Sequence, residues 1–194
     1  MDISDSSSLD LNFLKSDKSI QEEIKRAANN GVASFTFFCS AINRGIPRCY
    51  PKNLKDDFCV KITSPRNIEL LKMARQDKIL CTTKSPDTAF ELSKIDKILS
   101  IPVKCTLQYE NISSRFLFPV IPSDTLLQEI AEEIKQENDL SVKEIRRFIK
   151  RTNGTVLPSD KVLVTTYGTS LPPEIHICQT TKKNSLIYKQ SSNV

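Results

Sequence analysis

The chain has 194 residues, of which 39% are hydrophobic and 26% charged, a composition that excludes a wholly disordered protein. Its 28 Lys and Arg against 23 Asp and Glu give a net charge of +5, which suits an acidic partner without requiring one. The first residues carry acids where a secretory signal needs a basic start. The most apolar stretch, residues 32–42, is shorter than the roughly 18–20 residues of a membrane helix. We therefore expect a cytoplasmic or nuclear protein that is not secreted and has no membrane partner.

Residue types with catalytic or metal-binding chemistry are sparse. The chain has four glycines, six cysteines with no C-x₂-C spacing, and a single histidine, His176. Structural zinc and nucleophilic catalysis both need more than this set supplies, and no glycine-rich phosphate loop is present. We therefore expect no catalytic residues, no metal, no cofactor and no small-molecule substrate. In a reducing compartment all six cysteines are expected to be thiols.

The predicted elements of the first half begin with a strand. Residues 1–32, rich in Ser and Asp, are expected to form a flexible tail with at most a short helix near 21–28. In residues 33–40 a period of two predicts a strand with Phe35 and Phe37 on one face and Phe38 on the other. The elements predicted after it are, in order, a helix at 52–63, strands at 68–75 and 78–84, a helix capped by Ser85 and a strand at 102–107.

The second half repeats this order of elements. We predict, in order, a strand at 116–118, an amphipathic helix capped by Ser123 with Leu126, Leu127, Ile130 and Ile134 as its apolar stripe, strands at 142–151 and 161–167, and closing strands near Ile175 and Leu186. Gly168, Pro172 and Pro173 leave no room for a second helix. The repeated order predicts an α+β protein with two ferredoxin-like domains, at residues 33–110 and 111–190, each an antiparallel sheet with helices on one face.

A basic segment in the second half is the main candidate site. Its cationic residues, opposed only by Glu144 and Asp160, are Lys143, Arg146, Arg147, Lys150, Arg151 and Lys161. Cationic and aromatic side chains on a sheet are what binding of single-stranded RNA requires, although a charge run can also be an ordinary solvated surface. We expect Arg146, Arg147, Lys150 and Arg151 to contact phosphates, without deciding which arginine points outward. If Val162 and Val164 are in the core, alternation places Lys161 and Tyr167 on the open face, and Phe38 is the matching aromatic of the first domain.

Two segments carry a resemblance to a known family. Residues 143–177, KEIRRFIKRTNGTVLPSDKVLVTTYGTSLPPEIHI, have paired arginines, a Gly-containing turn, Pro158-Ser159 and an aromatic-Gly-x-x-Leu-Pro sequence from Tyr167. They resemble the second RNA-recognition-motif-like domain of Gag-like proteins, encoded by the first open reading frame of LINE-type retrotransposons. Residues 73–105 look like the end of the preceding domain, so the resemblance covers about residues 33–190.

The resemblance implies single-stranded RNA binding and ribonucleoprotein assembly with the element's own transcript. The sequence departs from the family in lacking zinc knuckles, so it looks like a truncated copy or a fragment. Phe116-Leu117-Phe118 replaces the usual Gly-Val-Ile strand, and the third strands at 77–84 and 160–167 lack the aromatic-rich octamer of ordinary RNA-recognition motifs. The weak aromatic signal leaves open a protein–protein interaction or self-association module on the same fold.

Overall fold

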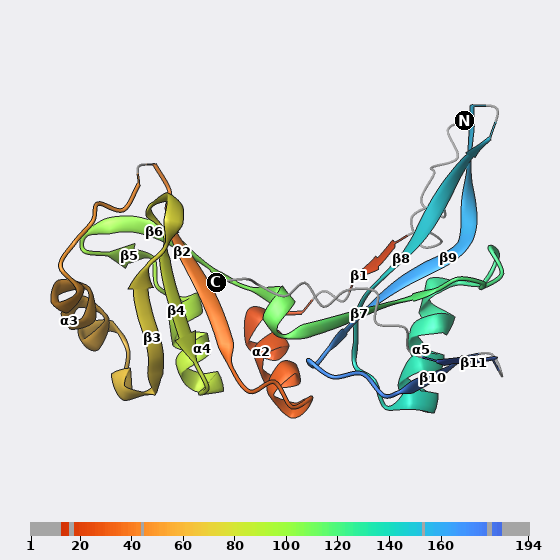
Figure 1. Cartoon of the computed structure of the whole chain (residues 1–194), viewed down its shortest axis with the longest axis horizontal. Coiled ribbons are helices and arrows are strands. Elements are labelled where there is room, and N and C mark those ends of the chain that lie inside the picture. Colours follow the sequence, from red (N-terminus) through yellow and green to blue (C-terminus); the bar gives the residue numbers. More distant parts are fainter. Residues whose placement is uncertain (1–12, 16–17, 44, 153, 178–179, 184–194) are drawn as a thin grey trace, which may run out of the picture. The chain divides into compact units, whose positions relative to one another are not determined.

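The computed structural model describes residues 13–15, 18–43, 45–152, 154–177 and 180–183. The chain divides into two compact units, which we call the first unit (Lys18–Ile112) and the second unit (Met1–Asp17 together with Ser113–Val194). Each is α+β and is built around its own antiparallel sheet (Figure 1). Among the described residues, no helix combines the length and the apolar character needed to cross a membrane.

The first unit has a five-stranded sheet in the order β3-β4-β2-β6-β5. Its elements are, in chain order, α2 (Ile20–Asn29), β2 (Phe35–Ala41), α3 (Pro51–Lys61), β3 (Ile68–Met73), β4 (Ile79–Thr83), α4 (Pro86–Ser93), β5 (Lys97–Ile98) and β6 (Ile101–Leu107). The strands and helices predicted for residues 33–107 are confirmed, with the short β5 added. A tight turn joins β3 to β4, with positive φ at Gln76 and Asp77.

The expected N-terminal tail differs from the structure wherever its residues are described. Ser19 and Glu22 form a capping box that starts α2, and Ile24 and Ala27 on this helix are buried. α2 packs against α4, so residues 20–29 belong to the first unit. Sequence reasoning had favoured a tail because the segment is polar overall. Two apolar residues at helical spacing, together with the capping box, are enough to hold one buried helical stripe.

The second unit has a four-stranded sheet in the order β1-β8-β9-β7. Its elements are, in chain order, β1 (Phe13–Lys15), β7 (Ser113–Phe118), α5 (Leu127–Asn138), β8 (Val142–Thr152), β9 (Thr155–Tyr167), β10 (Glu174–Ile177) and β11 (Thr180–Lys183). β1 is a second departure from the expected tail, because it pairs antiparallel with β8.

The C-terminal strands do not close this sheet as predicted. Ile175 lies in β10, which pairs with β11 in a separate two-stranded sheet. The side chains of Ile175 and Ile177 instead join the core beneath α5. Asn138 at the end of α5 fixes β10 through the backbone of His176, accepting its N–H at 2.7 Å and donating to its carbonyl at 2.8 Å. Leu186, the other expected closing position, lies outside the described residues.

One face of the second sheet is covered by α5. Leu127, Ile130 and Ile134 of the helix pack with Phe116 and Phe118 of β7, and the same core includes side chains from β8, β9 and β10. The helix begins later than predicted, at Leu127. The predicted cap, Ser123, lies in a turn closed by the Thr125 N–H and the Pro122 carbonyl at 3.2 Å, and Leu126 is 45% exposed instead of in the stripe.

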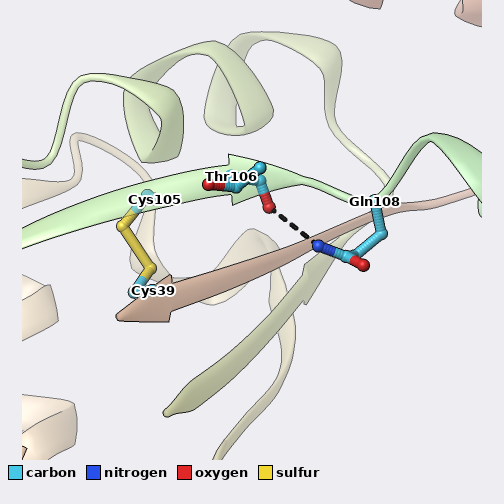
Figure 2. Close-up of a disulfide and its surroundings, with 4 residues drawn as sticks. All are labelled: Cys39, Cys105, Thr106 and Gln108. Carbon is cyan, nitrogen blue, oxygen red and sulfur yellow. Dashed lines mark hydrogen bonds between the residues drawn. A yellow bond between two sulfur atoms is a disulfide. The ribbon is translucent and has the colours of Figure 1, made fainter. Parts of the chain in front are cut away.

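A disulfide joins Cys39 of β2 to Cys105 of β6 (Figure 2). The two residues are direct partners in the antiparallel register of the first sheet, and Cys39 shares its face with the buried Phe37. The expectation of six thiols is therefore wrong for this pair. It rested on compartment alone, whereas directly opposed residues of neighbouring strands bring their Cβ atoms within reach of a disulfide. Cys49, Cys59 and Cys81 are free.

Two of the free cysteines should differ sharply in reactivity. Cys81 is buried in β4, and burial raises the pKa of its thiol to about 12, whereas Cys59 on α3 is exposed. At pH 8 only about one Cys81 in ten thousand is thiolate, the reactive form. We expect iodoacetamide to label Cys59 in the native protein and Cys81 only after unfolding, as measured by peptide mass spectrometry. Labelling of both residues at similar rates in the native protein would contradict the burial of Cys81.

Candidate nucleic-acid interface

The sheet face opposite α5 carries the exposed part of the basic segment. Ile145 points into the core with Val164, so its neighbour Arg146 points to the other side, where it lies opposite Leu163 of β9 and Phe13 of β1. Arg146 is exposed, and Phe13 is 45% exposed. An aromatic ring therefore lies directly across the strand pair from a guanidinium.

Four cationic side chains share this side of the sheet. Lys15 lies opposite Glu144, which is opposite Thr165, which in turn is opposite Arg115 of β7. Lys161 is two residues from Leu163 on β9 and so lies diagonal to Arg146. We call the set Lys15, Arg115, Arg146 and Lys161 the basic face. All four are exposed, and Glu144 is the one acid in the same register rows of the described sheet.

Such an arrangement can bind an extended polyanion. The four strands place the cations at positions spread across the width of the sheet, with no deep cavity required for access. Lys and Arg at this spacing can each contact a different phosphate of a single strand, and Phe13 offers a ring on which a base can stack. Because phosphate contacts carry no sequence information, the basic face by itself gives affinity without specificity.

Arg147 has a structural role and does not belong to the basic face. Arg147 is 2% exposed, and its guanidinium donates to the carbonyls of Thr125 at 2.8 Å, Ser159 at 3.0 Å and Ile121 at 3.3 Å. Burial lowers its pKa, an effect that the nearby Asp124 and Asp160 oppose. The assignment of Arg147 to phosphate contact is therefore wrong, because alternation along β8 turns it toward the core side, where carbonyls of the segment before α5 and of β9 accept its hydrogen bonds.

Tyr167 is also buried, at 1% exposure, and cannot stack on a base as expected. It follows Leu163 and Thr165 on the open side of β9, as alternation predicted, but it is the last residue of the strand. Its N–H donates to the carbonyl of Ser141 at 2.9 Å, and Ser113 lies opposite it on β7. Alternation assigns a face to a side chain, whereas the coverage of a strand end depends on chain segments distant in sequence.

Lys150 and Arg151 lie apart from the basic face. β8 has an irregularity between Arg147 and Ile149, and both residues lie beyond it in the hairpin that β8 forms with β9. Both are exposed. The Lys150 ammonium lies 3.2 Å from a carboxylate oxygen of Asp160, and this hydrogen bond is the main cause that lowers the pKa of Asp160. The structure thus separates the predicted cluster of four basic residues into a face, a buried anchor and a hairpin.

Phe38 lies on the open side of the first sheet, as predicted. It is half-buried in β2, between Leu80 of β4 and Thr106 of β6, on the side opposite the buried Phe37. Lys72 of β3 lies beyond Leu80, and Lys104 of β6 lies beside Ser40. This surface is more apolar and less basic than the basic face, and Phe38 is its one aromatic side chain in the described register rows.

Sequence reasoning missed three residues of the interface. Arg115 could have been found, because Phe116 and Phe118 in the core imply that Arg115 and Leu117 point outward. Phe13 and Lys15 gave no usable signal, because β1 has only three residues and pairs with a strand more than a hundred residues later.

Known proteins provide no assignment for this site. No protein-family model matches the chain, and neither does any curated protein or solved structure. Within the described residues, no cluster of three or more His, Cys, Asp or Glu side chains could hold a metal ion. The candidate site therefore rests on the geometry of the basic face.

The neighbouring arginines 146 and 147 offer a matched test of these roles. Arg147→Ala removes three hydrogen bonds from a buried charged donor and leaves buried carbonyls without a partner, so we expect a loss of about 3 to 5 kcal/mol in the free energy of unfolding. Arg146→Ala changes an exposed side chain and should stay within about 0.5 kcal/mol of the wild type. Urea denaturation followed by circular dichroism measures both. Equal effects of the two changes would show that Arg147 is not the anchor.

Proposed function

We propose that the protein binds single-stranded RNA through the basic face of the second unit, with a binding role and no catalytic one. The observation that carries the proposal is the placement of Arg146 on an exposed sheet face beside Lys161 and Phe13, away from the helix-covered core. An open sheet face with cations and a ring suits an extended strand, whose bases are free to stack. A duplex presents its bases only within grooves, which the broad face of a four-stranded sheet does not enter.

We further propose that both units have a ferredoxin-like, RNA-recognition-motif-like fold. In the first unit the elements β2-α3-β3-β4-α4-β6 follow the β-α-β-β-α-β order, and the sheet places the first strand, β2, between the third and the fourth. In the second unit β7, β8 and β9 have the same relative places as β2, β3 and β4, with β9 in the middle. This order supports the proposal that the chain is related to the Gag-like proteins of LINE-type retrotransposons, whose domains it resembles in sequence.

The salt dependence of RNA binding tests the proposed phosphate contacts. Each neutralised phosphate of a single strand contributes about −0.7 to the slope of log K against log salt, so three or four contacts predict a slope near −2 to −3. Replacing Lys15, Arg115, Arg146 and Lys161 together by Gln should flatten this slope and weaken binding similarly for all sequences. Fluorescence anisotropy with oligo(U) and a mixed-sequence RNA at several salt concentrations measures both effects.

A variant of equal charge separates the basic face from a general charge effect. Lys25, Arg26, Lys52 and Lys55 are exposed on α2 and α3, and their replacement by Gln removes the same four charges from the first unit. We expect this control to keep most of the slope. If the two quadruple variants lose affinity equally, binding follows net charge alone, and the basic face is not the site.

The ring of Phe38 can be tested as a second, sequence-tolerant contact. If a base stacks on it, Phe38→Ala should weaken RNA binding by about 1–3 kcal/mol without changing the salt slope, because stacking releases no counterions. Phe38→Tyr keeps the aromatic face and should retain affinity. Unchanged affinity in the alanine variant would remove the first unit's open face from the RNA site and leave the proposal to the second unit alone.

A further inference from the structure

Glu144 is a single acidic side chain among the cations of the basic face. It is half-buried on β8, where Lys15 of β1 lies directly opposite it and Arg146 lies two residues along the same strand. On the other side, Thr165 of β9 separates it from Arg115 of β7. A carboxylate therefore has a cation on each of three sides, on the surface that we propose as the RNA site.

The fold makes no use of this carboxylate within the described part of the chain. The Glu144 side chain has no hydrogen bond and no ion pair among the described residues, although Lys15 is its direct partner in the register. The carboxylates of Asp57, Glu69 and Asp160 are each paired with a lysine. A carboxylate is an acceptor only, with two oxygens that can take a pair of donors. Both oxygens of Glu144 are therefore available to a ligand.

A phosphate is the wrong group to lie over Glu144. Like charges in contact repel, and the repulsion is several times stronger near a protein surface than in bulk water. A single strand whose phosphates contact Lys15, Arg115 or Arg146 must therefore turn an uncharged group toward the carboxylate between them. In RNA this group is either a base or a ribose hydroxyl.

Phe13 favours a base at this position. Its ring is exposed, and the residue lies opposite Arg146 and diagonal to Glu144 across the β1–β8 pair. Diagonal neighbours on adjacent strands are about 7–8 Å apart, a distance that aromatic and long side chains can span. A base that stacks on Phe13 extends beyond the ring, so its edge comes within reach of the Glu144 oxygens.

We propose that Glu144 recognises the base stacked on Phe13 and gives the interface a preference for guanine, which rests on RNA binding by the basic face. Guanine has two neighbouring donors on its Watson–Crick edge, N1–H and the N2 amino group, and they match the two oxygens of a carboxylate. Adenine and cytosine each offer one amino group beside an acceptor nitrogen. The single N–H of uracil lies between two carbonyls, which a carboxylate repels. Paired, charge-assisted hydrogen bonds are both strong and geometrically specific, so Glu144 supplies the discrimination that phosphate contacts lack.

Binding to short U-rich RNAs that differ only in one central nucleotide tests the proposal. The wild-type protein should bind the RNA with guanine about tenfold more tightly than the RNA with uracil. Inosine lacks the N2 amino group and should lose most of this preference. Glu144→Gln keeps the size of the side chain but replaces one acceptor by a donor, so guanine and inosine should then bind within about twofold of uracil. Fluorescence anisotropy gives the dissociation constants.

Glu137→Gln is the matched control, because Glu137 is an exposed acid of α5 in the same unit and its replacement removes the same charge. It should leave the preference for guanine unchanged. The RNA with uracil should bind Glu144→Gln at least as tightly as the wild type, because a negative charge has left the face. If Glu144→Gln changes the affinity for every RNA by the same factor, Glu144 acts through its charge or through a ribose hydroxyl, and the proposal is overturned.

The same titrations separate the preference for guanine from RNA binding itself. Binding with the expected salt slope and no base preference would overturn the role of Glu144 and leave the basic face as the RNA site. A preference for guanine that persists in Glu144→Gln would assign recognition to other residues and overturn that role too. Absence of binding to every RNA would overturn both the proposed function and the preference.

Discussion

The second unit depends on one buried cation. The guanidinium of Arg147 collects the carbonyls of Ile121, Thr125 and Ser159, which belong to two segments on either side of β8. Carbonyls that lie next to a core without a backbone partner need a donor, and one guanidinium supplies several in a fixed plane. By holding the turn before α5, Arg147 sets where the helix begins. Through Ser159 it also holds β9 between Pro158, which is opposite Ile149 of β8, and Val162, where the pairing with β7 starts.

The division between Arg146 and Arg147 follows from this constraint. Neighbouring strand residues point to opposite faces, so a core-facing Arg147 directs Arg146 outward. The irregularity after Arg147 then separates Lys150 and Arg151 from the sheet surface. One run of basic residues therefore serves three physical purposes: an exposed cation on the open face of the sheet, a buried hydrogen-bond donor, and charges on the hairpin at the end of β8. Charge counts along the sequence cannot distinguish these roles.

Much of the secondary structure could be predicted from the sequence because local signals agree with the tertiary structure. The alternation in β2 correctly places Phe35 and Phe37 on one face, which is buried, and Phe38 on the other, and Ser85 with Pro86 marks the start of α4. The failures share a physical cause, which is pairing between distant segments. β1, the disulfide of Cys39 with Cys105 and the burial of Tyr167 all depend on partners whose proximity no local pattern reports.

The pairing of β1 with β8 has a consequence for the order in which the protein folds. The first unit lies in the chain between β1 and the remainder of the second unit, so β1 is synthesised first but must wait for β8. Its docking closes a loop of roughly 130 residues, an entropic cost that grows only slowly with length but exceeds that of any hairpin in the unit. The three described residue pairs between β1 and β8 contribute little stabilisation to offset that entropic cost. During synthesis the first unit can therefore fold as a complete body, whereas the second can acquire its edge strand only after β8 has been made.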